Sequence, residues 1–403
     1  MASTSELTLL VMPDGPIAFD GKDFRYSKGE RLYIDNLAKD FKEVQLATFV
    51  LREGDSFYES CIHSKFESKN IVVKELPRPF KKNLGVFEKS LQFLRVFIYV
   101  LKLARKVDFG YLFLPSYPSA IGCIALKIFS KKHFVYGADD WIQASESMFR
   151  WPEKRNTLFY RFYANLNKFM ERFVVSSSLF GVAAGGQLIE KYVNYGCKTY
   201  ATTPRMTLSS SDIFERDDTC LGEQITIINV GSLIHDKAQH ILLEAFYKSS
   251  KKHKNLNLNI VGEGPEEINL KKLSIKLGIS NRVNFLGYIE DESILYEYLR
   301  NADIFALSSV TEGFPRVLYE AMAMRLPIVT TNVGGIPFLL SDKENAILSE
   351  SRNVDQFSES LNSVIENNNL RKKIILKSKK TINEVFTSID KSQISKLLNK
   401  HIM

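Results

Sequence analysis

Two glutamates bracket the start of a predicted helix, and their spacing suits the binding of hydroxyl groups. Glu312 lies in the loop after a strand predicted at 304–307, and Glu320 lies two turns into a helix predicted at 316–324. The two carboxylates are at most ~12 Å apart along the helix axis. Because carboxylates accept hydrogen bonds from vicinal hydroxyls, one glutamate can hold a sugar ring and the other a ribose. The residues alone leave another possibility, in which Glu312 caps the helix and Glu320 is a solvated surface charge.

The turn around Glu312 has the composition of an anion-binding loop. Gly313 and Pro315 stand where the predicted strand gives way to the helix. A glycine there lets backbone amides approach a ligand, and the N-terminus of a helix favours negative charge. We therefore expect a phosphate-bearing ligand at this turn.

Short apolar runs alternate with helical patterns along the chain, which indicates α/β structure with parallel sheets and crossover helices. The alternation occurs twice, and a polar stretch without a regular period, 202–218, separates the two halves. Ligands of doubly wound sheets bind at the carboxyl ends of the strands, so functional residues should follow strands directly. The expected strands are 7–12, 44–49, 71–76, 111–115, 134–137, 225–230, 256–261, 282–286, 304–307 and 328–330.

Composition excludes several classes of protein. A chain of 403 residues with 45% hydrophobic and 25% charged residues is typical of a soluble globular protein with room for two cores. The longest apolar run, near 96–104, contains Lys102 and is too short for a membrane span. Residues 1–6 lack the basic region of a signal peptide, and four scattered cysteines favour a reducing compartment. The net charge of +8 decides little, because lysines occur in every segment.

Further motifs extend the pattern around the two glutamates in a fixed order. They are Asp303-Ile304-Phe305-Ala306, Thr311-Glu312-Gly313-Phe314-Pro315, Tyr319-Glu320-Ala321-Met322-Ala323, Pro327-Ile328-Val329 and Gly334-Gly335-Ile336-Pro337. Together they closely resemble the donor-binding core of the family 4 glycosyltransferases, retaining enzymes of GT-B fold whose signature is a Glu-x7-Glu pair. The resemblance implies two Rossmann-like doubly wound domains facing a central cleft, at 1–205 for the acceptor and 206–385 for the donor. It also implies a C-terminal helix, at about 386–403, that packs back on the first domain.

The segment 231–238 looks like the Gly-Arg … Lys-Gly loop of the same family. This similarity makes Lys237 the candidate for stabilising the departing diphosphate, since a lysine there is a point charge. Ser232 stands where the family commonly has arginine, and Ala238 where it commonly has glycine. Serine brings no charge, so Arg316 and Arg205 are candidate replacements for the missing cation.

Two more loops of the C-terminal half resemble those that frame the nucleotide base. They are 261–265 and 283–288, although a Gly-x-Gly by itself usually marks an ordinary turn. Phe338 departs from the family pattern, which often has glutamate there. The donor-binding residues that the resemblance implies are Gly29, Gly231, Ser232, Lys237, Gly262, Gly264, Gly287, Tyr288, Glu312, Gly313, Phe314, Pro315, Arg316, Val317, Leu318 and Glu320.

The resemblance fades in the first 200 residues, where one element remains. The segment 26–31, leading into a helix expected at 32–41, resembles the glycine-rich loop of the family, although Gly29 as a simple turn residue is equally expected. After the strand 134–137, Asp139 or Asp140 can orient or deprotonate an acceptor hydroxyl, or cap the next helix. The implied catalytic residues are Glu312, Lys237, Asp139 and Asp140.

Two basic segments rich in aromatic residues, 84–107 and 155–173, have the pattern of helices that lie in a membrane interface. Such a stripe is more often part of a protein core. Contact with an anionic membrane is therefore one hypothesis for these segments. Nucleic acid is not expected as a partner, because no nucleic-acid motif accompanies them.

The resemblance implies transfer of a hexose or N-acetylhexosamine from a nucleotide-diphosphate sugar to a glycan, either a lipid-linked or a cell-surface polysaccharide acceptor. A UDP-sugar is favoured over a GDP-sugar, and the expected location is the cytoplasm, at the inner face of the cell membrane. No cofactor or metal is expected, because no Asp-x-Asp or histidine cluster lies near these loops. The alternatives are a nucleotide-sugar epimerase of GT-B architecture and a non-catalytic sugar-nucleotide-binding subunit. An oxidoreductase would need a Gly-x-Gly-x-x-Gly after the first strand, and the sequence lacks one there.

Overall fold

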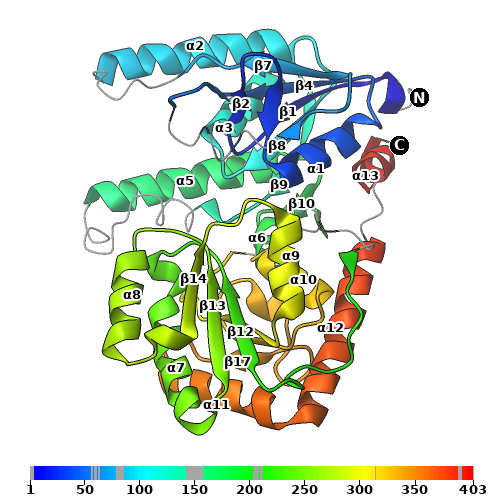
Figure 1. Cartoon of the computed structure of the whole chain (residues 1–403). Coiled ribbons are helices and arrows are strands. Elements are labelled where there is room, and N and C mark those ends of the chain that lie inside the picture. The colour runs from blue at the N-terminus through cyan, green and yellow to red at the C-terminus, as the bar shows by residue number, and fades with distance from the viewer. Residues whose placement is uncertain are drawn as a thin grey trace. The chain divides into compact units, whose positions relative to one another are not determined.

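A computed structural model of the chain (Figure 1) forms two compact units. It describes residues 4–55, 58, 61, 64–78, 86–141, 158–202, 208, 212–313, 315–388 and 393–402. Unit 1 comprises Met1–Thr207 and Ile389–Met403, and unit 2 comprises Leu208–Ser388. The boundaries expected from the sequence, after residues 205 and 385, differ from these by two and three residues.

Unit 1 is built on a parallel sheet of seven strands in the order β11-β10-β9-β8-β1-β4-β7. The chain places β4 and then β7 on one side of β1. It then returns to place β8 on the other side of β1, followed outward by β9, β10 and β11. This order makes the sheet doubly wound, as the sequence predicts. The strands are β1 (Thr8–Met12), β4 (Glu43–Thr48), β7 (Ile71–Glu75), β8 (Phe109–Leu114), β9 (Lys132–Gly137), β10 (Gly181–Ala183) and β11 (Thr199–Ala201).

A second, smaller sheet in unit 1 has the strand order β5-β2-β3-β6. Its strands, β2 (Ile17–Phe19), β3 (Phe24–Tyr26), β5 (Val50–Leu51) and β6 (Ser64–Lys65), lie in the connections that follow β1 and β4. The sequence analysis does not predict this sheet, because strands of two or three residues show too little alternation to stand out.

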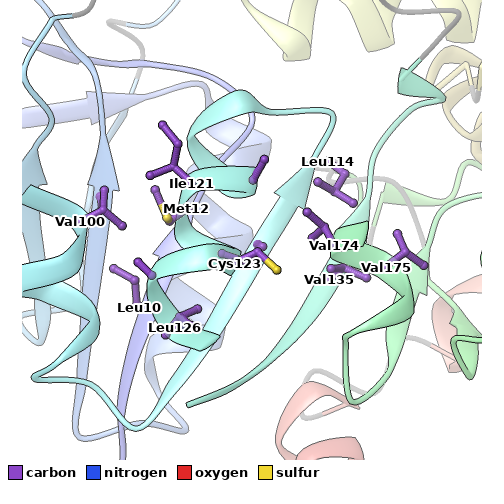
Figure 2. Packing of buried hydrophobic residues seen from close by; sticks show 14 of the residues in the cluster. Leu10, Met12, Val100, Leu114, Ile121, Cys123, Leu126, Val135, Val174 and Val175 are labelled. Carbon is purple, nitrogen blue, oxygen red and sulfur yellow. The ribbon is translucent and has the colours of Figure 1, made fainter. Parts of the chain in front are cut away.

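Side chains of the large sheet alternate between two cores, as the pleat of a strand requires. Leu10, Leu112 and Val135 point into a core that also contains residues of four helices, whereas Leu9 and Tyr111 point into the core on the other face. Figure 2 shows the first of these cores, with side chains from strands and helices interleaved. The helices of unit 1 are α1 (Lys28–Ala38), α2 (Val86–Ala104), α3 (Tyr117–Ile128), α5 (Leu158–Ser176), α6 (Gly186–Asn194) and α13 (Gln393–Ile402).

The last helix, α13, completes unit 1 although it follows unit 2 in the chain. Leu397 and Leu398 are buried in the same core as Leu9. The hydroxyl of Ser395 donates a 2.8 Å hydrogen bond to the carboxylate of Asp40. Unit 1 is therefore assembled from two distant stretches of the sequence.

Unit 2 has a parallel sheet of six strands in the order β14-β13-β12-β15-β16-β17, the second doubly wound arrangement. The strands are β12 (Ile225–Val230), β13 (Leu256–Val261), β14 (Val283–Gly287), β15 (Ile304–Leu307), β16 (Ile328–Thr331) and β17 (Ile347–Ser349). The helices are α7 (Gln239–Lys252), α8 (Glu267–Lys276), α9 (Glu292–Asn301), α10 (Val317–Ala323), α11 (Val354–Glu366) and α12 (Asn368–Ser388), with short 3-10 turns η3 (His235–Lys237), η4 (Ser280–Arg282) and η5 (Ile336–Phe338).

One face of the sheet of unit 2 is covered by α7, α8 and α11, whose apolar side chains pack on alternate strand residues such as Ile227 and Leu258. Both residues are fully buried. Because this core fixes the positions of the strands, it also fixes where the loops at their carboxyl ends begin. No helix in the described part of the chain is both long enough and apolar enough to cross a membrane.

Candidate functional site

The strand order of unit 2 reverses between β12 and β15, which pair side by side at the centre of the sheet. At such a switch point the two loops that follow the strands lead away in opposite directions and leave room for a ligand. The loop after β12 carries Lys237, and the loop after β15 carries Glu312. The sheet therefore brings together two candidate residues that are 75 positions apart in the sequence.

Lys237 and Glu312 form a close ion pair across this switch point. The Nζ of Lys237 lies 2.7 Å from Oε1 and 2.8 Å from Oε2 of Glu312. The Glu312 side chain is 6% exposed and that of Lys237 is 23% exposed. An ammonium group has three donors, so a lysine that holds a carboxylate can also turn a proton toward an incoming anion.

Buried serine and threonine side chains hold the pair in place. The hydroxyl of Ser309 donates a 2.5 Å hydrogen bond to Oε1 of Glu312, and the hydroxyl of Thr331 donates to the carbonyl of Ser309. The hydroxyl of Ser308 donates to the carbonyls of Lys237 and Ala238. Both loops are thus tied together by groups from β15 and β16 before any ligand binds.

The backbone at Ala238 explains why a glycine suits this position. Ala238 has φ +46° and ψ +42°, in the left-handed region, where it ends η3 and precedes α7. An L-residue other than glycine pays roughly 1–2 kcal/mol for this conformation. The chain accepts that strain, which lets η3 turn Lys237 toward Glu312.

Two glycines of the loop after β13 allow backbones to approach closely. A Cβ on Gly262 would lie 2.1 Å from the carbonyl oxygen of Gly231, and one on Gly264 would lie 2.3 Å from that of Leu233. The amide of Leu233 donates to the carbonyl of Glu263 at 2.8 Å. These glycines therefore pack the loop after β13 against the loop after β12.

Gly334 serves the same purpose next to Glu312. It has φ +53°, and a Cβ there would lie 1.7 Å from the carbonyl oxygen of Glu312. The amide of Gly335 donates to that carbonyl at 3.2 Å. The turn after β16 therefore positions the backbone of Glu312, while Lys237 and Ser309 hold its side chain.

Glu320 differs from Glu312 in having a carboxylate that lacks partners. Its Oε2 is buried and has no hydrogen-bond partner among the described residues. Burial, and to a smaller extent the nearby charge of Glu292, raise the pKa of Glu320 to about 7, while Arg316 opposes the shift. A buried acceptor without a partner is costly, and a donor such as a ligand hydroxyl would satisfy it.

The turn before α10 holds the other residues expected there. Arg316 is exposed at the start of the helix, which begins one residue later than the sequence predicts. Pro315 and Leu318 are buried, so Leu318 can offer a ligand only its backbone. Gly313 and Val317 are partly exposed. Phe314 and Arg205 lie outside the described residues.

Around the other strand ends, Ser232 is exposed and Gly231 is partly exposed. The amide of Gly262 donates to the carbonyl of Gly287 at 2.7 Å, which links the loops after β13 and β14. Tyr288 is 61% exposed next to this link. Its ring is available for stacking on a planar group.

In unit 1, the structure corrects the prediction for Gly29. The sequence predicts a loop at 26–31 and a helix from 32, but α1 begins at Lys28 and buries Gly29 in its first turn. The loop between β1 and this helix is instead occupied by β2 and β3. Gly29 can therefore contribute to a site only from the N-terminus of α1.

Asp139 and Asp140 follow β9, at the carboxyl edge of the sheet of unit 1. Oδ1 of Asp139 accepts a hydrogen bond from the amide of Asp140. Asp140 forms a 2.7 Å ion pair with Lys191, which also binds the fully buried Glu171 at 2.6 Å. Burial raises the pKa of Glu171, and its partner Lys191 opposes the shift. Asp140 thus belongs to an ion-pair network that ties β9 to α5 and α6.

Sequence reasoning missed the residues that support the pair. Ser308, Ser309 and Thr331 are fully buried, and Asn229 donates to the carbonyl of Ala306 between β12 and β15. One sequence feature could have indicated these residues. They are polar side chains directly after or within otherwise apolar strands, and a polar side chain buried there needs a hydrogen-bond partner.

A comparison with known protein families identifies the segment that carries this site. Residues 212–381 match the family model described as glycosyl transferases group 1. This segment is a glycosyl transferases group 1 domain. It contains the whole Lys237 and Glu312 arrangement, so the predicted resemblance is confirmed at the level of this family.

The domain has relatives of known sequence. An uncharacterized glycosyltransferase of Haemophilus influenzae is 41% identical over 146 residues, which cover 36% of this chain and 40% of the relative. The lipopolysaccharide core biosynthesis glycosyltransferase LpsE of Rhizobium meliloti is 28% identical over 156 residues, covering 39% of this chain and 44% of LpsE. This chain therefore aligns with less than half the length of these relatives.

The fold of the whole chain is similar to that of a solved structure. The structure of HepE from Anabaena in complex with UDP-glucose matches with a TM-score of 0.69 at 17% identity, and covers 98% of this chain and 100% of HepE. At this identity the match shows the fold alone. The fold is GT-B, as the sequence predicts.

Substituting Gly334 in the group 1 domain tests the close approach to Glu312. We expect Gly334→Ala to cost about 2 kcal/mol or more of unfolding free energy, because its Cβ overlaps the Glu312 carbonyl in addition to the strain of positive φ. Gly278→Ala is a matched control, since Gly278 has φ +71° with open space around its Cβ position. Urea denaturation of the two variants measures the difference. Equal losses would show that the approach to Glu312 does not matter.

The carboxyl of Glu320 in the same domain should make stability fall as pH rises. The folded protein holds a proton on Glu320 up to about pH 7, whereas the unfolded chain loses it near the ordinary pKa of 4.5. Unfolding free energy should therefore decrease between these pH values and stay lower above them. Glu320→Gln removes this term, and should exceed the parent by ~2–3 kcal/mol at pH 8 but not near pH 4.5.

Thermal denaturation across this pH range measures the effect, with Glu297→Gln as the control because Glu297 is an exposed carboxylate of α9. If the advantage of Glu320→Gln does not grow with pH, burial does not raise the pKa of Glu320 as described above.

Proposed function

We propose that the chain transfers a sugar from a nucleotide-diphosphate donor, with retention of configuration at the sugar carbon. The observation that carries the proposal is the Lys237–Glu312 pair, held at the switch point of a doubly wound sheet in a group 1 domain. A cation and a carboxylate side by side suit a ligand that has a diphosphate next to a hydroxyl-bearing ring.

In the proposed reaction, Lys237 and backbone amides stabilise the diphosphate as its bond to the anomeric carbon breaks. The acceptor oxygen bonds to that carbon from the same face, and its proton passes to the departing phosphate oxygen. No protein nucleophile is needed. Glu312 accepts hydrogen bonds from the hydroxyls of the donor sugar, and Glu320 accepts them from the ribose.

The unpaired Oε2 of Glu320 supports its role, because two ribose hydroxyls would supply the donors that this buried atom lacks. The exposed ring of Tyr288 is proposed to lie against the base. Asp139 or Asp140, which follow β9 at the carboxyl edge of the sheet of unit 1, is the proposed residue for orienting the acceptor hydroxyl. The positive charge of Lys237 does the work that a metal would do, so we propose transfer without a metal.

We propose a UDP-hexose or UDP-N-acetylhexosamine as donor, in keeping with the UDP-glucose bound in the HepE structure. The proposed acceptor is a glycan on a lipid or a cell-surface polysaccharide, in keeping with the name of LpsE. The proposed place of work is the cytoplasmic side of the cell membrane, reached by peripheral contact.

Nucleotide binding gives the first test. UDP should raise the melting temperature more than GDP or ADP do, and UDP present at 100 times its Kd would add about 2.7 kcal/mol of stability. The measurement is a thermal shift for each nucleotide and its sugars. A larger shift with GDP would overturn the choice of donor, and no shift with any of them would overturn the proposed function.

Activity gives the second test, since Lys237→Met should lower kcat by about 100-fold or more with little change in fold. Lys272→Met on exposed α8 is the matched control and should keep full activity. Sugar transfer is measured by product formation with and without added acceptor, and in the presence of EDTA. A release of altered free sugar without acceptor would instead indicate an epimerase, and loss of activity with EDTA would contradict transfer without a metal.

A double substitution separates catalysis from stability. Lys237→Met alone leaves the buried Glu312 carboxylate without its cation, which costs about 1–3 kcal/mol. Adding Glu312→Gln removes that stranded charge, so the double variant should regain stability yet remain inactive. If sugar transfer in the host pathway persisted with either variant in place of the parent chain, a non-catalytic sugar-nucleotide-binding subunit would be favoured instead.

A further inference from the structure

Helix α5 of unit 1 has apolar side chains on two opposite sides. Phe162, Leu166 and Phe169 recur every three to four residues and are 66%, 39% and 66% exposed. On the other side Val174 and Val175 are fully buried in the core of unit 1, and Met170 packs against that core. A helix on the surface of a domain needs only one apolar side, which packs on the core. Helix α5 therefore has a second apolar side that is exposed to solvent.

Helices α2 and α3 repeat this arrangement. Leu91, Leu94 and Ile98 of α2 are 43%, 49% and 45% exposed, and Ile124 and Ile128 of α3 are 43% and 56% exposed. Each set has the spacing of one helix side. The opposite sides, with residues such as those labelled on α2 and α3 in Figure 2, fill the core beneath.

The three exposed sides are neighbours, because α3 packs against both α2 and α5. The Nζ of Lys127 on α3 also lies 4.6 Å from the ring centre of Phe173 on α5. The outer sides of α2, α3 and α5 therefore lie next to one another on unit 1, and we call them the apolar face. Sequence analysis picks out the segments of α2 and α5 but not the helix between them.

The charged residues around the apolar face are of one sign. Within residues 91–104 of α2, residues 117–128 of α3 and residues 161–176 of α5, the single acidic residue is Glu171, which is buried and paired with Lys191. The exposed basic residues stand next to, or three to four positions from, the apolar ones, and their long side chains can reach past them to phosphates. They are Arg95, Lys102, Lys127, Arg161, Lys168 and Arg172.

This charge pattern identifies the occupant of the apolar face. A two-fold contact between copies of the chain would bring basic residues against basic residues, which opposes dimer formation. Large apolar side chains interleaved with lysine and arginine are instead the pattern that binds anionic lipid headgroups. We propose that the apolar face of α2, α3 and α5 docks on the surface of an anionic lipid bilayer.

Co-sedimentation with vesicles tests this inference without donor or acceptor, so the result does not depend on the proposed transfer activity. The whole chain should sediment with vesicles of phosphatidylcholine and phosphatidylglycerol but much less with phosphatidylcholine alone. Raising the salt from about 0.1 M to about 1 M shortens the screening length from about 10 Å to about 3 Å and should weaken binding.

Phe162→Ser with Phe169→Ser should lower partitioning onto anionic vesicles by about tenfold or more, because two buried rings are lost from the lipid interface. Ile268→Ser with Ile275→Ser on α8 is the matched control. These two residues have the same seven-residue spacing and are both 67% exposed, but lie in unit 2. The control should bind vesicles like the parent chain.

A charge variant provides a second, independent measurement. Arg161→Glu with Lys168→Glu should abolish the preference for phosphatidylglycerol, whereas Lys272→Glu with Lys276→Glu on α8 should keep it. Vesicle binding that survives both apolar-face variants would overturn the inference, as would a parent chain that binds no vesicles. Self-association in solution that the phenylalanine variant removes, without vesicle binding, would show that the apolar face is a protein interface instead.

Discussion

The contact between Lys237 and Glu312 is the interaction on which the arrangement of unit 2 depends. It joins the two loops that leave the central strands β12 and β15. Each partner makes the burial of the other tolerable, because an isolated charge at this depth would be strongly disfavoured. The hydroxyls of Ser308 and Ser309 and the turn at Gly334 then serve to keep the pair in one geometry. A ligand meets a site whose electrostatics are arranged in advance.

Backbone conformation makes that geometry possible. Ala238 accepts a left-handed turn, and Gly262 and Gly264 let three loops share hydrogen bonds at distances that a side chain would block. The site is thus made of close-packed backbone with a few polar side chains inserted into it. Glu320 is the exception, because its carboxylate is buried without being satisfied. Within the domain, the side chain of Glu312 is thus already paired with Lys237, whereas Oε2 of Glu320 still lacks a hydrogen-bond donor that a ligand could supply.

Much of the fold and of the candidate site could be predicted from the sequence. Why a prediction succeeded or failed differs from one element to the next. The long buried strands β12, β13 and β15 cover the ranges expected from their apolar runs, since a strand buried on both faces has a strong signal. The short strands β2, β3, β5 and β6 could not be predicted, because runs of two or three residues show too little alternation and β5 and β6 pair with segments distant in sequence. At the site, motif spacing pointed to Lys237 and Glu312 separately. Their direct contact depends on the pairing of β12 with β15, which no local pattern encodes. The serines below them look ordinary in sequence, and α1 begins at Lys28, four residues before the start expected at 32.

The position of α13 has a consequence for how the protein is made. Most of unit 1 precedes unit 2 in the chain and is synthesised before it, yet Leu397 and Leu398, which belong to the core of unit 1, follow unit 2. Until α13 is made, the sheet of unit 1 lacks part of the cover on one face, where the ring of Phe180 stacks on that of His401. Unit 2, which is one continuous segment, has all of its core residues sooner. The core of unit 1 therefore becomes complete only after unit 2 has been made, and a chain that stops before α13 leaves the core of unit 1 open rather than that of unit 2.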